Sequence, residues 1–130
     1  MITFSVSPAG TFDDVVERTR AALADEGFGV LSEIDISETL RVKVGADMRP
    51  YVILGACNPP LAKRAIDAEP TIGALLPCNV VVRETVDGVV VDFMDPGAVL
   101  DLIDQEVIHE VGREARQRLQ RAAAFLDQPI

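Results

Sequence analysis

Several residue types are scarce in this sequence of 130 residues. It has no tryptophan, one histidine and two cysteines, and aromatic residues make up 5% of it. With so few aromatic side chains, we expect a core built from valine, leucine, isoleucine and alanine. The length is that of one ordinary domain, so we interpret residues 1–130 as a single domain.

Positive charge is also scarce, with 12 lysines and arginines against 21 aspartates and glutamates and a net charge of −9. Nucleic-acid binding depends on cationic contacts to phosphate, so this balance argues against nucleic acid and against an anionic membrane as partners. No apolar run approaches the ~20 residues of a membrane span. The start of the chain, MITFSVSPAG, has no basic segment and too short an apolar part for a signal peptide. We therefore expect a cytoplasmic protein whose two cysteines are free thiols.

Common catalytic and binding signatures are missing as well. The sequence contains no GxGxxG after a strand, no phosphate-binding loop, no GxSxG and no HExxH. We interpret His109 as a partly exposed helix residue, because nothing in the sequence orients it as a base. Acidic pairs such as Asp101 and Asp104 fit a solvated helix face. The sequence thus names no catalytic residue, no cofactor and no metal site, and it favours a protein that is not an enzyme.

The apolar patterns predict a mixed order of strands and helices. Alternation over residues 2–6 predicts a strand, and Thr11 is placed to cap a helix that ends at Gly27. Residues 28–33 form a second predicted strand. The segment 35–45 fits a strand or a short helix, and we favour the helix because no turn residue separates it from the preceding strand.

The second half of the chain is clearer. Residues 51–56 read as a strand covered on both faces, and a helix, a loop over 71–77 and a hairpin with its turn at Asp87-Gly88 follow. From Asp95-Pro96 a long helix runs to about Leu126, with a bend near Gln105. Gly112 in that helix indicates a close contact with another element. These elements predict a two-layer α+β domain with a curved, mainly antiparallel sheet of about five strands, helices on one face and a long C-terminal helix.

The stretch from Tyr51 to Glu84 contains both cysteines, each followed by asparagine. Asn58 is placed to cap a helix with Pro59 at its first position, and Asn79 begins a strand beside Cys78. Helix amides next to Cys57 would favour its thiolate and lower its pKa. We favour the interpretation of both cysteines as small buried apolar residues. If their strands are neighbours, the two thiols could instead form a reversible dithiol, bind a soft metal or flank a ligand pocket.

The segments ILGACNPPLAKRAI and GALLPCNVVVRE, followed by a hairpin, resemble the prokaryotic "domain of unknown function 302" family. The resemblance is strongest from Arg49 to Val91. It implies a small α+β domain similar to the TATA-binding-protein-like fold and a tendency to form homodimers. The characteristic residues of the family fall here on the cysteine motifs, including Cys57, Asn58, Pro59 and Cys78. The resemblance assigns no activity and no catalytic residue.

Three hypotheses of function follow, of which an uncharacterised enzyme with a site built from backbone groups, Asn58, Asn79 and a nearby Arg or Lys ranks last. The first is a non-catalytic homodimeric binding or interaction module, with a small-ligand site near Cys57 and Cys78 whose candidate residues also include Asn58, Pro59 and Asn79. The alternative is a thiol-based redox or soft-metal-responsive protein that uses Cys57 and Cys78. Another copy of the chain is the expected partner in the first hypothesis, and a small molecule is a further one.

Overall fold

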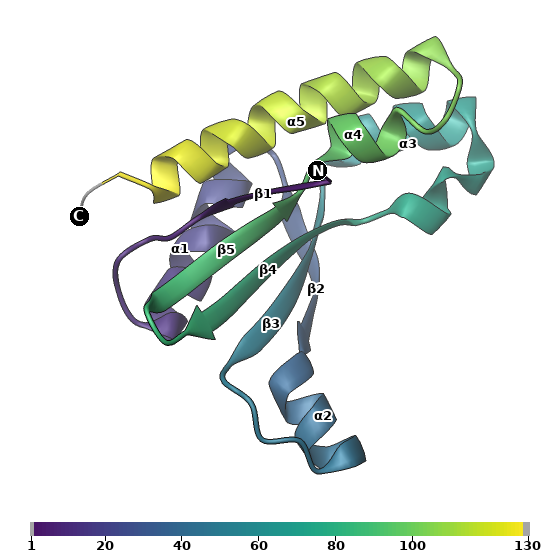
Figure 1. Cartoon of the computed structure of the whole chain (residues 1–130). Helices are drawn as coiled ribbons and strands as arrows, with labels where there is room; N and C mark the ends of the chain where they lie inside the picture. The colour runs from purple at the N-terminus through teal and green to yellow at the C-terminus, as the bar shows by residue number, and fades with distance from the viewer. Residues whose placement is uncertain (1, 129–130) are drawn as a thin grey trace.

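The computed structural model describes residues 2–128. Along the chain the elements are β1 (Thr3–Val6), α1 (Phe12–Asp25), β2 (Gly29–Asp35), α2 (Ile36–Val44), β3 (Tyr51–Cys57), α3 (Pro59–Ala68), the 3₁₀-helix η1 (Pro70–Leu75), β4 (Cys78–Thr85), β5 (Gly88–Met94), α4 (Pro96–Leu100) and α5 (Glu106–Leu126). All five strands pair antiparallel in the order β1-β5-β4-β3-β2. Helices α1, α3, α4 and α5 cover one face of this sheet (Figure 1). The predicted α+β class, strand number and long C-terminal helix are confirmed.

Local capping signals begin the helices where the sequence predicts. Thr11 Oγ1 accepts a hydrogen bond from the amide of Asp14 at 3.2 Å, which begins α1. The Asn58 carbonyl oxygen accepts from the amide of Leu61 at the start of α3, also at 3.2 Å. Asp35 caps α2 in the same way. The short helix that we favoured for residues 35–45 is therefore confirmed.

The C-terminal helical segment is two helices, so the prediction of one long helix with a bend near Gln105 is wrong. Helix α4 ends at Leu100 and α5 begins at Glu106, because α4 folds back against α5. Gly112 makes this contact possible. A Cβ atom at that position would lie 2.9 Å from the backbone oxygen of Pro96. The close contact predicted from Gly112 is thus a helix–helix contact.

Two predictions in the middle of the chain need small corrections. The loop expected over residues 71–77 contains the 3₁₀-helix η1, whose Ile72 is buried. The hairpin is present, but Thr85 pairs with Gly88, so its two loop residues are Val86 and Asp87. Gly88 takes a φ of +140°, which explains why glycine follows the turn directly.

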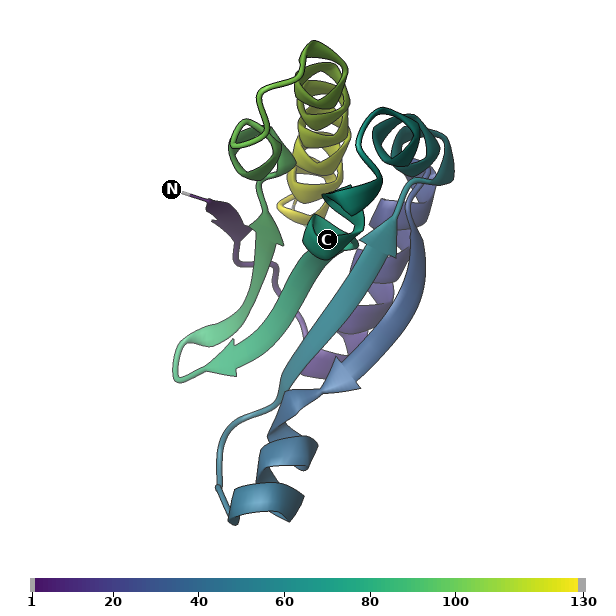
Figure 2. The same cartoon turned by 90° about the vertical axis from the view of Figure 1, so that its right-hand side faces the viewer.

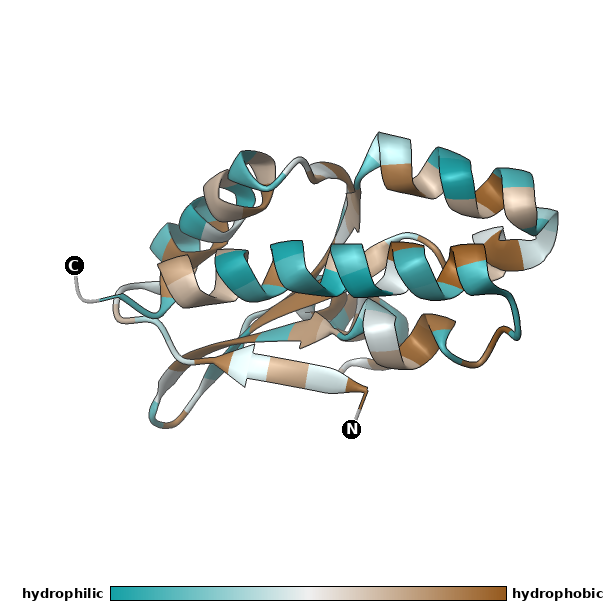
Figure 3. Ribbon diagram, turned by 90° about the horizontal axis from the view of Figure 1, so that it is seen from above, coloured by the Kyte–Doolittle hydropathy of each residue, from teal (hydrophilic) through white to brown (hydrophobic). Residues whose placement is uncertain are grey.

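The core lies between the helices and the inner face of the sheet and is mainly aliphatic, as predicted. Its largest fully buried side chains include Phe28 and Phe93, and Phe93 stacks on Phe4 with ring centroids 5.3 Å apart. Figure 3 shows α5 from above, with hydrophilic residues along its outer side. Among residues 2–128, no helix is both long enough and apolar enough to cross a membrane.

Candidate functional site

The pairing of β3 with β4 brings the two cysteine motifs together at one end of the sheet. Ala56 lies opposite Cys78 and Gly55 lies opposite Asn79 in the antiparallel register. The two strands are therefore neighbours, as a site shared by both cysteines requires. Both cysteines are free thiols, with Cys78 buried and Cys57 partly exposed.

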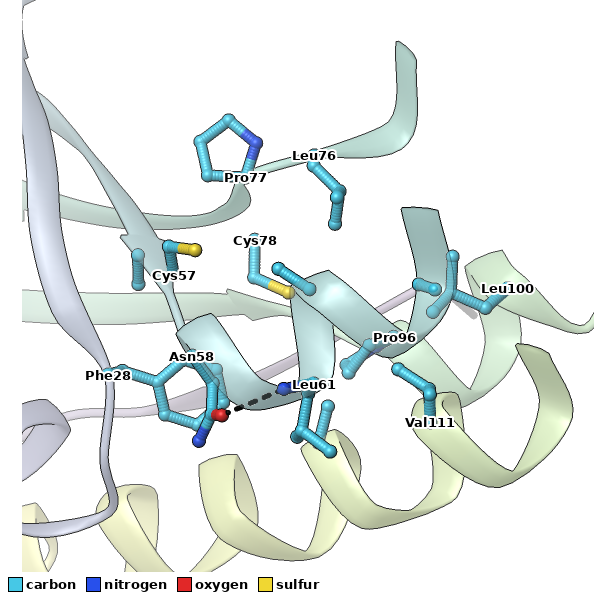
Figure 4. Close-up of a pocket in the computed structure, with 14 residues that line it drawn as sticks. Phe28, Cys57, Asn58, Leu61, Leu76, Pro77, Cys78, Pro96, Leu100 and Val111 are labelled. Atoms are coloured by element: carbon cyan, nitrogen blue, oxygen red, sulfur yellow. Dashed lines mark hydrogen bonds between the residues drawn. The ribbon is translucent and has the colours of Figure 1, made fainter. Parts of the chain in front are cut away.

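A small cavity of about 30 Å³ adjoins both cysteines (Figure 4). Its walls come from the end of β3, from α3 and from the facing turns of α4 and α5, and they are formed largely by apolar side chains such as Leu61, Leu76, Leu100 and Val111. Pockets that hold organic ligands typically measure about 300–1,000 Å³. The cavity therefore has room for one or two waters and no preformed room for a metabolite.

Cys78 is poorly suited to nucleophilic chemistry at neutral pH. In Figure 4 its sulfur points toward α3, among apolar residues. Burial, with a smaller contribution from the neighbouring Cys57, raises the pKa of the Cys78 thiol to about 11. Since the thiolate is the nucleophile and the metal ligand, this residue stays protonated and inert at pH 7.

Asn58 is a structural residue in this arrangement. It is buried, and its carbonyl oxygen is occupied by the α3 cap. A Cβ atom on Gly27 would lie 3.0 Å from the Asn58 amide nitrogen, so the side chain is also packed against the end of α1. Gly27 has a φ of +83°, which favours glycine independently.

The remaining candidate residues do not converge on the cavity. Pro59 is exposed in the first turn of α3, and Asn79 is exposed on β4. Because strand residues alternate between faces, Asn79 lies on the face of the sheet opposite to Cys78. The structure thus brings Cys57, Asn58 and Cys78 around one cavity and separates Asn79 from them.

Gly55 is a nearby residue that sequence reasoning missed. A Cβ atom there would lie 2.3 Å from Ser32 Oγ and 2.9 Å from Pro77 Cγ. Glycine is therefore needed where Ser32 on β2 and Pro77 before β4 close over β3. The Leu76–Pro77 peptide bond is cis. Within residues 2–128, no three histidine, cysteine, aspartate or glutamate side chains are grouped as a metal site would require.

A second surface lies on the outer side of the sheet. No helix of residues 2–128 covers it (Figure 2). Its strand residues include Ile34, Ile53 and Val81, which lie side by side across β2, β3 and β4. Figure 2 shows this curved sheet with the helices gathered on its other side. We call this surface the open face and define it by its central residues Ile34, Tyr51, Ile53, Val81, Arg83, Val90 and Asp92.

The open face carries one charge of each sign among these residues, and the two are paired. Arg83 Nε donates to Asp92 Oδ2 at 2.6 Å, and Ser5 Oγ donates to Asp92 Oδ1 at 2.6 Å. Partial burial of Asp92 opposes its ionisation, but the hydrogen bonds from Arg83 and Ser5 outweigh that effect and lower its pKa. Asp92 is thus ionised and neutralised by Arg83 at pH 7.

Comparison with known proteins identifies similar sequences and a similar structure. The family model "Domain of unknown function DUF302" matches residues 2–126. The crystal structure of an uncharacterized conserved DUF302 protein from Bacillus stearothermophilus superimposes with a TM-score of 0.89 at 28% identity, over 97% of this chain and 98% of that one. No curated protein matches the sequence.

Proposed function

Because this chain belongs to the DUF302 family, a family of unknown function, we propose a function from the chain's own surface. It is a non-catalytic interaction module that acts as a homodimer, and the open face is where its two copies meet. The observation that carries this proposal is the apolar, charge-neutral centre of the open face.

The composition of the open face is unusual for a surface in water. An antiparallel sheet with one wet face normally alternates apolar residues inward with polar residues outward. Here Ile34, Ile53 and Val81 form an outward apolar row, with Tyr51 and Val90 in the next row. Ile34 is exposed and the others are partly exposed. Depletion of charge around such residues is typical of the buried core of a protein interface.

The charge distribution favours a second copy as the occupant. The chain carries a net charge of −9, so two copies repel each other through most of their surfaces. The open face avoids this repulsion, because its single carboxylate, Asp92, is paired with Arg83. A two-fold axis would place the same neutral apolar row on both sides of the contact.

The small-ligand site near Cys57 and Cys78 stays a prediction. The cavity there is small, and Cys78 is protonated at neutral pH. A redox or soft-metal role gains no support from these properties, since both roles need an accessible thiolate. The open face therefore supports the interaction hypothesis better than the cysteines support the alternative.

The test is a pair of matched isoleucine variants studied by analytical ultracentrifugation. Ile53→Asp places an unpaired carboxylate in the centre of the open face, and we expect it to weaken dimerisation at least about a hundredfold. Ile66→Asp makes the same change on the exposed side of α3, on the helical side of the molecule, and should leave the dimer unchanged. A dimer that tolerates Ile53→Asp as well as Ile66→Asp would rule out the open face as the interface.

A further inference from the structure

Helix α2 projects away from the rest of the molecule. In Figures 1 and 2 it extends beyond the end of β2 and β3, at the opposite end of the sheet from α3 and α4. None of its residues is buried. We call residues 36–50, which comprise α2 and the loop that leads to β3, the arm.

The arm is rich in exposed apolar side chains. Ile36, Leu40 and Val44 recur at helical spacing and form one stripe, in which Ile36 and Leu40 are partly buried and Val44 is 73% exposed. Val42 and Met48 add further exposed apolar surface. A helix of nine residues is marginal in water without packing partners, even with good caps. The start of the stripe packs partly beside β3, whereas its end at Val44 and the neighbouring Val42 stay exposed in the described residues 2–128.

The arm also differs in charge from the rest of the chain. It carries three cations, Arg41, Lys43 and Arg49, against the two carboxylates Glu38 and Asp47. That leaves nine of the 12 cations and nineteen of the 21 carboxylates in the remaining residues, so the arm is net +1 and the body is net −10. An acidic body is thus the complementary surface for this arm.

We propose that the arm packs against a second copy of this chain and extends the dimer contact beyond the open face. The two surfaces are continuous, because Ile34 of the open face is followed within two residues by Ile36 of the arm. Each copy would contribute its arm and receive its partner's, as two-fold symmetry requires. This inference rests on the proposed homodimer and adds to it the element that fixes how the two copies are held.

The first test is another matched pair of variants. Val44→Asp charges the apolar stripe of the arm, whereas Val86→Asp makes the same change at the hairpin tip, where the valine is 78% exposed. We expect Val44→Asp to raise the dimer dissociation constant at least about tenfold and Val86→Asp to leave it unchanged. Dimerisation that withstands Val44→Asp but not Ile53→Asp would overturn the role of the arm and leave the open face standing. The reverse result would overturn the open face and keep the arm.

The second test uses the unaltered chain, so it does not depend on the folding of any variant. Amide hydrogen exchange is measured at protein concentrations above and below the dimer dissociation constant. We expect the amides of α2 to become protected on dimerisation, while those of α1, which is packed on its own domain, keep the same protection. Equal protection of α2 in monomer and dimer would show that the arm needs no partner. A chain that stays monomeric at all concentrations would instead refute the homodimer itself.

Removal of the arm gives a third readout. Asp35 pairs with Val52, so an Asn-Gly turn in place of residues 36–51 joins β2 to β3 as a two-residue hairpin. This change also removes Tyr51 of the open face, so Tyr51→Ala in the full chain is the control. We expect this shortened chain to keep the circular dichroism spectrum of a folded domain, apart from the lost helical signal of the nine residues of α2, and to sediment as a monomer while the Tyr51→Ala control still dimerises. A shortened chain that folds and dimerises as tightly as the full one would overturn the proposal.

Discussion

At the scale of single residues, the chemistry of Cys57 and Cys78 follows from their different surroundings. Cys78 faces the helices inside the core, whereas Cys57 ends β3 in a partly exposed position. The two cysteines lie close together, as the sequence-based prediction of a shared site requires. They differ in exposure to solvent, and therefore in reactivity. Two thiols that differ in this way should be distinguishable by simple reagents.

We predict that one thiol reacts in the folded protein and the other only after unfolding. With a chromogenic disulfide at neutral pH, Cys57 should react first, and Cys78 should be released by denaturant, because burial keeps it protonated and out of reach. Cys57→Ser should remove the early reaction and leave the late one. Two thiols that react equally fast in the native protein would revive the redox hypothesis.

The raised pKa of Cys78 also predicts a pH dependence of stability. The folded thiol has a pKa of about 11, against 9.0 for the ordinary group. Below pH 9 both states are protonated and the effect is absent. As pH rises from about 9 to about 11, the unfolded thiol ionises first, so the free energy of unfolding falls by up to about 3 kcal/mol. Denaturant unfolding of Cys78→Ala should lack this part of the decline, and identical pH profiles for the two proteins would contradict it.

At the scale of elements, packing explains what capping signals alone do not. Thr11, Asn58 and Asp95 begin their helices as the sequence predicts, because each satisfies amides within its own first turn. The break between α4 and α5 was missed because no glycine or proline lies in residues 101–105 to mark it. It exists because α4 packs back onto α5, and such a tertiary contact leaves little trace in local sequence.

The α4–α5 contact gives a test of this explanation. We expect Gly112→Ala to destabilise the protein by about 1–2 kcal/mol, because overpacking against Pro96 outweighs the roughly 1 kcal/mol gain in helix propensity. Gly73→Ala is the control. No atom of the described residues lies within 4 Å of the Cβ added at Gly73, so the effect on stability should stay within about 0.5 kcal/mol. Thermal unfolding of both variants measures the two effects. A Gly112→Ala protein that is more stable than the unaltered chain would show that the contact between α4 and α5 is loosely packed.

The candidate site was predictable in part for similar reasons. The sequence places Cys57 at a strand end and Asn58 at a helix cap, since both follow from local patterns. The assignment of Cys78 and Asn79 to opposite faces requires the register of β3 and β4. Ile53 and Val81 are apolar residues at positions that face outward from the sheet, and in the sequence they indicate an apolar outer surface. Only the strand order shows that the two residues are neighbours.

At the scale of the whole molecule, the structure has a covered side and an uncovered side. The helices protect the inner face of the sheet, while the open face and the arm leave apolar side chains in water. Both surfaces are less acidic than the rest of a chain with a net charge of −9. A second copy that covers both surfaces accounts for the apolar row, for its neutral charge and for the exposed apolar side chains at the end of α2 with one arrangement.

The mass of the unaltered chain in solution tests this account most directly. Sedimentation equilibrium over a dilution series at micromolar concentrations should give a species of twice 14.0 kDa that dissociates to a monomer on dilution. A single species of 14.0 kDa throughout the series would contradict the account, because the open face and the arm would then be uncovered in the functional protein.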